Sequence, residues 1–242
     1  MNIRGIGHRG YPVKYPENTL SSFQAAIDLG FSHIELDVHL SKDGVPVVMH
    51  DYNIDRMTDG SGEIREYTVD QLQEFNVGEF EKIPTLEEVL RLAKGQIHVS
   101  IEMKNTKLYD AVEEKVCRIV QKLQMEEEVY VISFDHKSLA KMRALSSDIK
   151  IGPLVTKMKR SHLRLIEKLD AEYIAVKFDG LNEKYINKCE QMDVQVVAWT
   201  VNSIEQMQRL QKFPSILITT DELEKYKAYN ATYADNLEQV II

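Results

Sequence analysis

The sequence is sparing in several residue types, and each shortage excludes a class of protein. Two cysteines in 242 residues are too few for a disulfide scaffold, so we expect Cys117 and Cys189, both in helical patterns, to be buried thiols. The chain has only 11 glycines and 6 prolines, which excludes collagen-like and low-complexity proteins. No run of about 18 apolar residues occurs, so we expect no membrane span.

Positive charge is also short. The chain has 30 Lys and Arg against 38 Asp and Glu, a net charge of −8, which gives no broad surface for nucleic acid or anionic membranes but leaves room for a local basic pocket. Residues 1–5 have no basic region followed by an apolar stretch, so we expect no signal peptide and a cytoplasmic location. The expected partner is a small molecule, and the oligomeric state is left open.

Short apolar runs alternate with amphipathic segments along the chain. The runs predict eight strands, at Ile3–His8, His33–Leu40, His98–Lys104, Val129–Phe134, Lys150–Val155, Tyr173–Phe178, Gln195–Val201 and Ser215–Thr220. Helix-start signals stand between them at Asn18, Thr85-x-x-Glu88 and Ser203-x-x-Gln206. The alternation predicts parallel βαβ units, and eight of them favour an α/β fold of the closed (β/α)₈ TIM-barrel type, with an open doubly wound sheet as the runner-up.

One region breaks this rhythm. The turn signal Lys42-Asp43-Gly44 precedes a second extended run, Val45–His50, which predicts a hairpin on the second strand. About 30 mostly polar residues follow, in a position where barrels insert substrate walls. We therefore predict one domain over residues 1–242 with an inserted subdomain at residues 52–82, which serves as an active-site wall or is a plain surface excursion.

Acidic side chains stand on the inward face of two predicted strands. The period of two places Glu35 and Asp37 on one face of the second strand, and Glu102 and Lys104 on one face of the third. Carboxylates inside a barrel are costly unless they are paired or bind a cation. The all-oxygen set Glu35, Asp37 and Glu102 suits Ca²⁺ or Mg²⁺, and a carboxylate network with Lys104 and Arg9 explains the spacing equally well.

Two histidines end strand-like runs at the same predicted end of the barrel. His8 and His50 can serve as general acid and base, and Arg9 and Lys104 supply fixed positive charge for an anion. Histidines, cations and a divalent metal together indicate phosphoryl chemistry. The chain has no Walker loop and no Gly-x-Gly-x-x-Gly, so a nucleotide cofactor is not supported.

A series of short motifs carries a family resemblance. They occur in the order His8-Arg9-Gly10, Pro16-Glu17-Asn18-Thr19, Glu35-Leu36-Asp37-Val38, Lys42-Asp43-Gly44, His50-Asp51, Ile83-Pro84-Thr85-Leu86-Glu87-Glu88 and Glu102-x-Lys104. Each motif is weak alone, but the ordered set resembles the bacterial glycerophosphodiester phosphodiesterase family over essentially the whole chain, as far as Trp199.

The resemblance implies a fold, an activity and a set of site residues. It implies a TIM barrel with a small subdomain after the second strand, and metal-dependent hydrolysis of glycerophosphodiesters to glycerol 3-phosphate and an alcohol. The implied roles are metal binding by Glu35, Asp37 and Glu102, acid–base catalysis by His8 and His50, phosphate binding by Arg9 and Lys104, orientation of His8 or Arg9 by Glu17, and a substrate-pocket position for Trp199.

Three positions at strand ends are assigned from the residues themselves. The period of two turns Trp199 inward with Val197 and Val201, which is typical of barrel core as well as of a pocket wall. Phe134 and Lys177 end two further strands and are candidates for the rim of the pocket. His39 shares the face of Glu35 and Asp37 but lies near the hairpin, so it is equally well explained as a solvated loop residue.

For the mechanism, we expect His8 to take the proton of the glycerol 2-hydroxyl as it attacks phosphorus, and His50 to protonate the departing alcohol. Direct attack by water is the rival path. The identity of the cation and of the head group stays open at this point.

Two other functions compete with this one. A phospholipase D-like hydrolase of lysophospholipids needs an apolar groove, for which the insertion offers six apolar residues that one small core would use up: Met57, Ile64, Tyr67, Val69, Leu72 and Phe75. A non-catalytic phosphodiester-binding module is disfavoured because both histidines and all three carboxylates are present.

Overall fold

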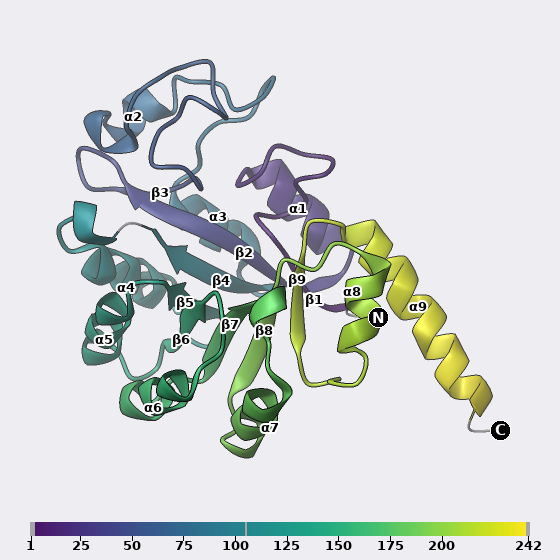
Figure 1. The fold of residues 1–242 in the computed structure, drawn as a ribbon. Coiled ribbons are helices and arrows are strands. Elements are labelled where there is room, and N and C mark those ends of the chain that lie inside the picture. Colours follow the sequence, from purple (N-terminus) through teal and green to yellow (C-terminus); the bar gives the residue numbers. More distant parts are fainter. Residues whose placement is uncertain (1–2, 105, 241–242) are drawn as a thin grey trace.

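In the computed structural model, which describes residues 3–104 and 106–240, eight parallel strands pair into a closed ring (Figure 1). The strands are β1 (Ile3–Gly7), β2 (Phe31–Leu40), β4 (His98–Met103), β5 (Val129–Ser133), β6 (Lys150–Val155), β7 (Tyr173–Lys177), β8 (Gln195–Trp199) and β9 (Leu217–Thr220). The ring closes because β1 pairs with both β2 and β9, so that Ile6 lies opposite His33 on one side and Thr219 on the other. The prediction of a TIM barrel is confirmed, and the open sheet is wrong.

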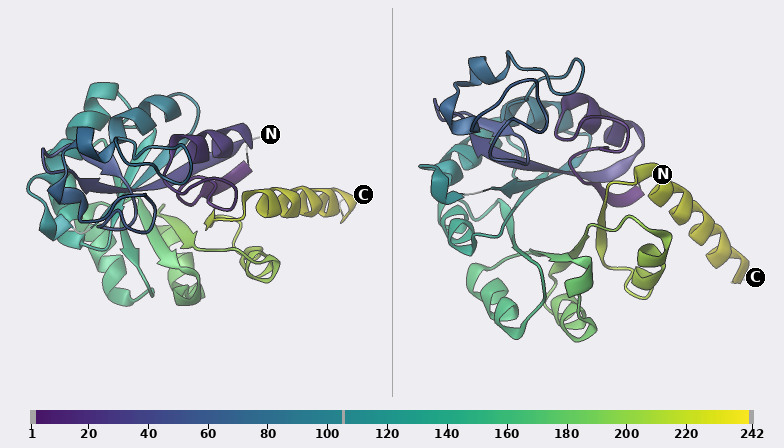
Figure 2. Two further views of the ribbon diagram at one scale, coloured as in Figure 1. Left: turned by 90° about the horizontal axis from the view of Figure 1, so that it is seen from above. Right: turned by 45° about the horizontal axis from the view of Figure 1, so that its top comes forward.

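Helices follow the strands around the ring. They are α1 (Leu20–Asp28), α3 (Leu86–Ala93), α4 (Val112–Leu123), α5 (His136–Leu145), α6 (Arg160–Leu169), α7 (Glu183–Gln191), α8 (Ile204–Leu210) and α9 (Leu223–Val240). Short 3-10 turns η2 (Thr106–Leu108) and η3 (Phe178–Gly180) follow β4 and β7. Helix α9 runs away from the barrel at its C-terminal end, in all three views of Figures 1 and 2.

The strands separate two apolar cores. Outward residues such as Ile34, Leu36 and Val38 pack with the helices in the large outer core. Inward residues such as Leu154 and Val197 form a smaller core inside the ring. The period-two assignment of the second strand is therefore confirmed, and it leaves the intervening positions of β2 facing into the barrel.

Strand β8 is shorter than its sequence pattern predicts, and this changes the orientation of Val201. The seventh predicted strand, Gln195–Val201, ends at Trp199 in the structure. The alternation stops there, and Val201 belongs to the outer core although it was predicted to face inward. Trp199 packs against the inner core, as predicted.

Helix caps follow from local hydrogen-bonding chemistry. The capping boxes at Thr85–Glu88 and Ser203–Gln206 are confirmed. The cap assigned to Asn18 is wrong, because Thr19 accepts the hydrogen bond from the backbone of Ser22 at the start of α1. The Asn18 amide instead donates to Asp37 Oδ2 at 2.9 Å inside the barrel.

The region after β2 forms a separate layer at one side of the barrel mouth. Strand β3 (Pro46–Val48) pairs antiparallel with β2, as the turn signal predicts. The segment beyond it contains η1 (Ile64–Glu66) and α2 (Val69–Leu72) and lies on the opposite side of the ring from α6 and α7 (Figures 1 and 2). All six apolar residues of the insertion noted in the sequence belong to one cluster with β3, so they are used in its own core.

The structure also bears on the cysteines and on membrane-spanning helices. Cys117 and Cys189 are free and buried, as predicted. Among the described residues, no helix is both long and apolar enough to span a bilayer.

Candidate active site

Three carboxylates converge inside the barrel at the C-terminal ends of β2 and β4. Asp37 and Glu102 are direct neighbours across the two strands, and Glu35 lies two residues before Asp37 on the same face. Oxygen atoms of all three lie within 4.8 Å of one another, and all three residues are buried. The sequence prediction that these side chains meet is confirmed.

Burial and mutual repulsion set the protonation of this cluster. Burial, together with the charge of Asp37, raises the pKa of Glu35 to about 8 and that of Glu102 to about 7. Burial also opposes ionisation of Asp37, but Lys104 and Arg9 outweigh it and hold the pKa of Asp37 below its usual value. The cluster is therefore short of positive charge, because two cations face three carboxylates.

Arg9 and Lys104 are those two cations. Lys104 Nζ lies 2.9 Å from Glu102 Oε1 and 3.4 Å from Asp37 Oδ1. Arg9 Nε lies 3.4 Å from Asp37 Oδ2, and Arg9 Nη1 donates to Glu17 Oε1 at 3.0 Å. The structure thus contains the carboxylate network with Lys104 and Arg9 that the spacing allows. It also leaves three carboxylates facing only two cations, which is compatible with a divalent metal site.

His8 follows β1 and is paired with a carboxylate from the far end of the chain. His8 Nδ1 donates to Asp221 Oδ1 at 2.6 Å, and Asn202 Nδ2 donates to Asp221 Oδ2 at 2.6 Å. Burial lowers the pKa of His8, but Asp221 and Glu35 outweigh it and bring the pKa above 6.5. Since Nδ1 is engaged, Nε2 is the nitrogen of His8 left for chemistry.

His50 has an equivalent arrangement on the other side. Its Nδ1 donates to Asp51 Oδ1 at 2.7 Å, and Arg56 Nε binds Asp51 Oδ2 at 2.6 Å. Arg56 Nη2 also donates to Glu17 Oε1 at 2.6 Å, which ties the insertion to the loop after β1. Burial and the nearby Lys104 lower the pKa of His50, although Asp37 opposes them.

His39 supports His50 from behind. Its ring is buried, with Nδ1 accepting from the Tyr109 hydroxyl at 2.8 Å and Nε2 donating to the His50 carbonyl at 3.1 Å. Burial lowers the pKa of His39 to about 4, so the ring stays neutral. Of the two alternatives for His39, the solvated loop residue is wrong, because strand β3 and the turn at Tyr109 cover this position.

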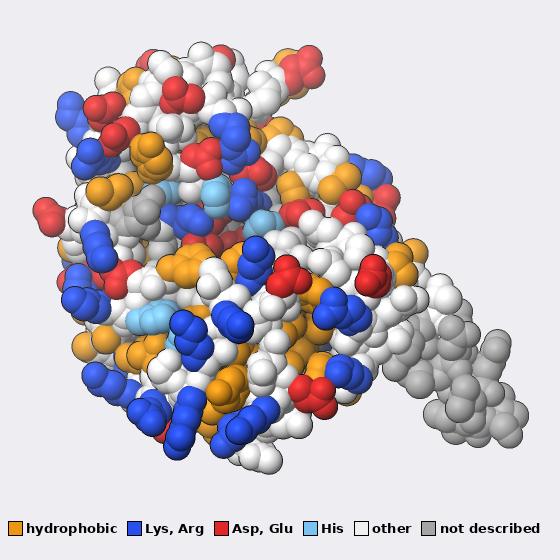
Figure 3. All heavy atoms as spheres, viewed as in Figure 1, with side chains coloured by type: hydrophobic (Ala, Val, Ile, Leu, Met, Phe, Trp, Pro, Cys, Tyr) orange, Lys and Arg blue, Asp and Glu red, His pale blue; other side chains and the backbone are white. Residues whose placement is uncertain are grey.

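A cavity of about 190 Å³ opens above the carboxylates. Its wall includes His8, His50, Trp199 and Phe134, and Figure 3 shows the corresponding hollow, with acidic, basic and histidine side chains inside it. Phe134 is 49% exposed and meets the Trp199 ring edge-on at 6.0 Å between centroids. The Trp199 indole Nε1 is buried with no hydrogen-bond partner in the described part of the chain.

A second groove of about 580 Å³ continues from this cavity over the ends of β4 and β5. The two share Glu102, Lys104 and Phe134, and the groove adds Lys107 and Leu108 on its outer side. Lys177 lines neither of them, although its position at the end of β7 suggested the rim.

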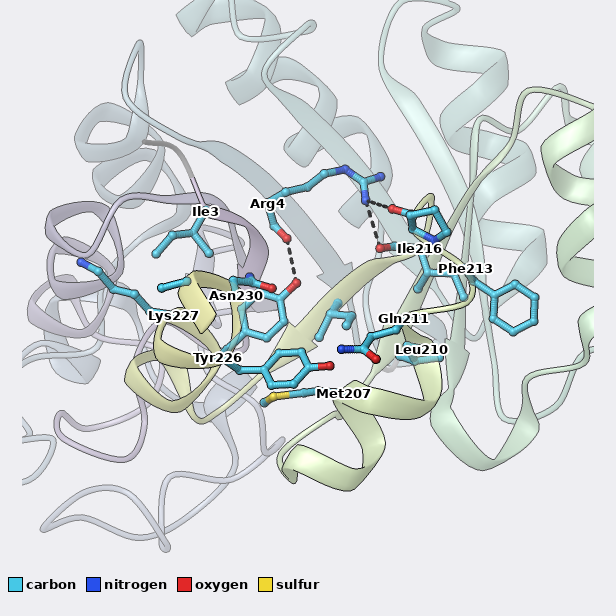
Figure 4. Close-up of a pocket in the computed structure, with 14 residues that line it drawn as sticks. Ile3, Arg4, Met207, Leu210, Gln211, Phe213, Ile216, Tyr226, Lys227 and Asn230 are labelled. Carbon is cyan, nitrogen blue, oxygen red and sulfur yellow. Dashed lines mark hydrogen bonds between the residues drawn. The ribbon is translucent and has the colours of Figure 1, made fainter. Parts of the chain in front are cut away.

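Another large cavity lies at the opposite end of the barrel and has a different character. Figure 4 shows it between β1, α8 and α9, lined mainly by apolar side chains such as Met207, Leu210 and Phe213. Arg4 Nη1 donates there to the carbonyls of Pro214 and Ile216. The described residues that line this cavity include no histidine and no Asp or Glu, in contrast to the cavity at the mouth.

Of the residues that support the site, only Glu17 was assigned a role from the sequence. Asp51 could have been found because it directly follows His50, and Glu17 was named for its motif. Asp221, Asn202 and Arg56 carry no such signal, since they are ordinary polar residues in loops until the barrel closes.

Comparisons with known proteins identify relatives of this chain over nearly its whole length. The profile of the glycerophosphoryl diester phosphodiesterase family matches residues 8–225. A glycerophosphodiester phosphodiesterase of Caldanaerobacter subterraneus subsp. tengcongensis is 33% identical over 93% of this chain and 96% of the relative, and one of Bacillus altitudinis is 33% identical over 85% and 89%. The fold resembles a phosphodiesterase of Oleispira antarctica, solved in complex with the product sn-glycerol-3-phosphate, with a TM-score of 0.84, 24% identity and coverage of 93% and 96%.

Proposed function

Because the chain belongs to the glycerophosphoryl diester phosphodiesterase family, it is a hydrolase of glycerophosphodiesters, and we propose that His8 and His50 carry the proton transfers of its reaction. The products are glycerol 3-phosphate and an alcohol. The observation that supports these roles is the pairing of each imidazole with its own carboxylate at the wall of one cavity, above three buried acids. We treat residues 1–242 as one catalytic domain with its insertion at 52–82, and we keep a cytoplasmic location as part of the proposal.

The three acids fit a divalent cation. Glu35, Asp37 and Glu102 offer only oxygen ligands, which suits Ca²⁺ or Mg²⁺, and their mutual repulsion is relieved by a positive ion. When bound, such an ion supplies charge stabilisation for the phosphate oxygens. Binding of a divalent cation explains why the barrel holds buried carboxylates that its own Arg and Lys side chains do not neutralise.

Arg9 and Lys104 hold the phosphate in this proposal. Both cations face the cavity, and Arg9 keeps its position through Glu17 and through its own backbone N–H, which donates to Glu35 Oε2 at 3.0 Å. The fixed charges stabilise the extra negative charge of the transition state without reorganisation. The buried, unpartnered indole Nε1 of Trp199 is a further donor for a substrate oxygen, and Phe134 covers the outer side.

The proton transfers follow from the free nitrogens of the two rings. One imidazole takes the proton of the glycerol 2-hydroxyl through Nε2 as that oxygen attacks phosphorus. The other gives a proton to the alcohol oxygen as its bond to phosphorus breaks. Water then opens the cyclic phosphate with the two roles reversed. Asp221 and Asp51 hold the rings in position during both steps.

The main alternative, hydrolysis of a lysophospholipid, is not favoured by the insertion. Its apolar side chains pack in their own cluster and offer no groove for an acyl chain. A small head group fits the cavity of about 190 Å³ better.

The decisive experiment measures release of glycerol 3-phosphate from glycerophosphocholine, glycerophosphoethanolamine and glycerophosphoglycerol, with Ca²⁺, Mg²⁺ or EDTA. We expect cation-dependent release that falls by at least about a hundredfold in His8→Ala and in His50→Ala. Full activity of either variant would overturn the acid–base assignment. Trapping of a cyclic glycerophosphate separates the two paths, because direct attack by water never forms one.

A further inference from the structure

Positive charge gathers on one side of the barrel mouth. Residues 149–166 contain five Lys and Arg and no Asp or Glu, in a chain whose net charge is −8. Together with neighbouring loops they form what we call the basic rim: Lys107, Lys137, Lys157, Lys159, Arg160, Arg164 and Lys177. The rim thus follows the C-terminal ends of β4, β5, β6 and β7 and the first turns of α5 and α6.

The cations of the rim are free to meet an external partner. All seven side chains are exposed, and none forms an ion pair with any residue that the structure describes. Figure 3 shows basic side chains gathered over α5, α6 and α7, on the same face as the active-site hollow. Two carboxylates lie close to the rim in sequence. Asp179, two residues after Lys177, is exposed. Asp135 accepts hydrogen bonds from the Thr106 hydroxyl and from the Lys137 backbone N–H at the start of α5.

The opposite side of the mouth has the reverse charge. Residues 52–82 contain eight Asp and Glu and three Lys and Arg. Acidic side chains are seen on this part of the surface, at the top of Figure 3. A polyanionic partner is therefore attracted to the rim and repelled by the insertion, which fixes the side on which it approaches.

The rim is not part of the substrate cavity. Lys107 lines the outer groove, but the other six rim residues line neither the catalytic cavity nor the groove. These six cations are therefore left unassigned by the substrate cavity.

Apolar side chains stand between the rim and the catalytic cavity. Leu108 is 45% exposed and Phe134 is 49% exposed, and both line the groove that continues outward from the active site. Exposed apolar residues beside unpaired cations are typical of surfaces that rest on a lipid headgroup layer. A nucleic acid duplex uses the cations but has no need of these two side chains, because its bases are already stacked on one another.

We propose that the basic rim, with Leu108 and Phe134 at its inner edge, docks on an anionic phospholipid surface and turns the active-site mouth toward it. Each Lys or Arg near an anionic bilayer adds several-fold to the binding constant, and the attraction falls off within a Debye length of about 8–10 Å. The surface lies beyond the hydrolytic reaction assigned above and does not depend on it.

The test is sedimentation of the full chain with vesicles of phosphatidylcholine alone and of phosphatidylcholine mixed with phosphatidylglycerol, at low and high salt. The rim variant combines Lys157→Glu, Lys159→Glu and Arg160→Glu. Its matched control combines Arg118→Glu, Lys168→Glu and Lys188→Glu, which are exposed residues on the outer helices with the same total charge change and no ion pair in the described chain. A third variant, Leu108→Ser, tests the apolar edge.

We expect the wild-type chain to bind the anionic vesicles, to release them at high salt, and to ignore the neutral ones. The rim variant should bind at least about tenfold more weakly than the control, and Leu108→Ser should bind more weakly than wild type. Equal binding to both vesicle types, or an equal loss in the control, would overturn the proposal. So would tighter, rim-dependent binding of duplex DNA at the same salt. Release of glycerol 3-phosphate from glycerophosphocholine should be unchanged in the rim variant, which separates failure of docking from failure of the enzyme.

Discussion

Asp221 and His8 are 213 residues apart in the sequence, yet they form a 2.6 Å hydrogen bond at the mouth of the barrel. The bond fixes which nitrogen of the ring carries the proton and which one faces the cavity. It also raises the pKa of His8 against the opposing effect of burial. The partner of His8, which we propose as an acid–base residue, is thus supplied by the residue that directly follows β9.

Replacing that partner gives the first prediction. Asp221→Asn should lower kcat by about tenfold to a hundredfold. A neutral amide does not stabilise the protonated imidazole of His8, and it holds the tautomer of the neutral ring less firmly than a carboxylate. The activity limb that reports His8 should move to lower pH, since the anion that raised its pKa is gone. A pH–rate profile measures both effects.

The control for this prediction is the same change in a His8→Ala background. If Asp221 acts through His8, the double variant loses no more activity than His8→Ala alone. An additive loss would contradict this role.

The carboxylate cluster gives the second prediction. In EDTA, Glu35→Gln should raise the Tm by about 2–4 °C, because it removes a buried group that resists ionisation beside Asp37. Added Ca²⁺ or Mg²⁺ should raise the Tm of the wild type and not that of the variant. Thermal unfolding checks both without an activity assay.

Glu113→Gln is the matched control, since Glu113 is equally buried but bonds Ser138 outside the site. It should keep the response to the cation. A Glu35→Gln protein that still gains as much stability from the cation as the wild type would remove Glu35 from the proposed ligands.

Gly10 gives the third prediction. Its φ of +86° and the 2.7 Å approach of a Cβ to the Ser22 carbonyl carbon leave no room for a side chain. Gly10→Ala should destabilise the fold by about 3 kcal/mol in urea unfolding.

Gly95→Ala separates the two causes, because Gly95 has a φ of +71° with nothing within 4 Å of a Cβ. It should cost about 1 kcal/mol. Equal losses in the two variants would mean that the contact with α1 contributes nothing.

His33 gives the fourth prediction, at the opposite end of the barrel. Burial, with the neighbouring His98 and Arg4, lowers the pKa of His33 to about 3. Below pH 6.5 His33 is protonated in the unfolded chain but not in the folded one. The free energy of unfolding therefore has its full value, as far as His33 is concerned, above pH 6.5 and declines as the pH falls toward 3. The slope is at most about 1.4 kcal/mol per pH unit.

His33→Asn should flatten the dependence of the free energy of unfolding on pH between about 6 and 4. His98→Asn, which removes the exposed ring stacked 5.0 Å away, serves as the control for lost contact. An unchanged pH slope in His33→Asn would assign the acid sensitivity to other groups.

Local periodicity predicted the barrel and the acidic cluster. Glu35 and Asp37 lie two residues apart on a strand, so their common face follows from strand geometry alone. Glu102 could be added because parallel strands end at one edge, where the register places it beside Asp37. These relationships require no knowledge of distant contacts.

Long-range closure and local competition account for what was missed. Asp221 reaches His8 only when β9 pairs with β1, which no local pattern indicates. Asn18 and Thr19 are both good caps, and the choice between them depends on Asp37, which takes the Asn18 amide. The net charge of the chain concealed the basic rim, because the acidic insertion cancels it in the sum.

The closure of the ring by β1 and β9 also has a consequence for the timing of synthesis. His8 and Arg9 leave the ribosome before β9 and Asp221 do. A nascent chain therefore carries its histidine without the partner that orients it. Hydrolytic competence is expected to arise in one late step, when the final strand completes the cylinder.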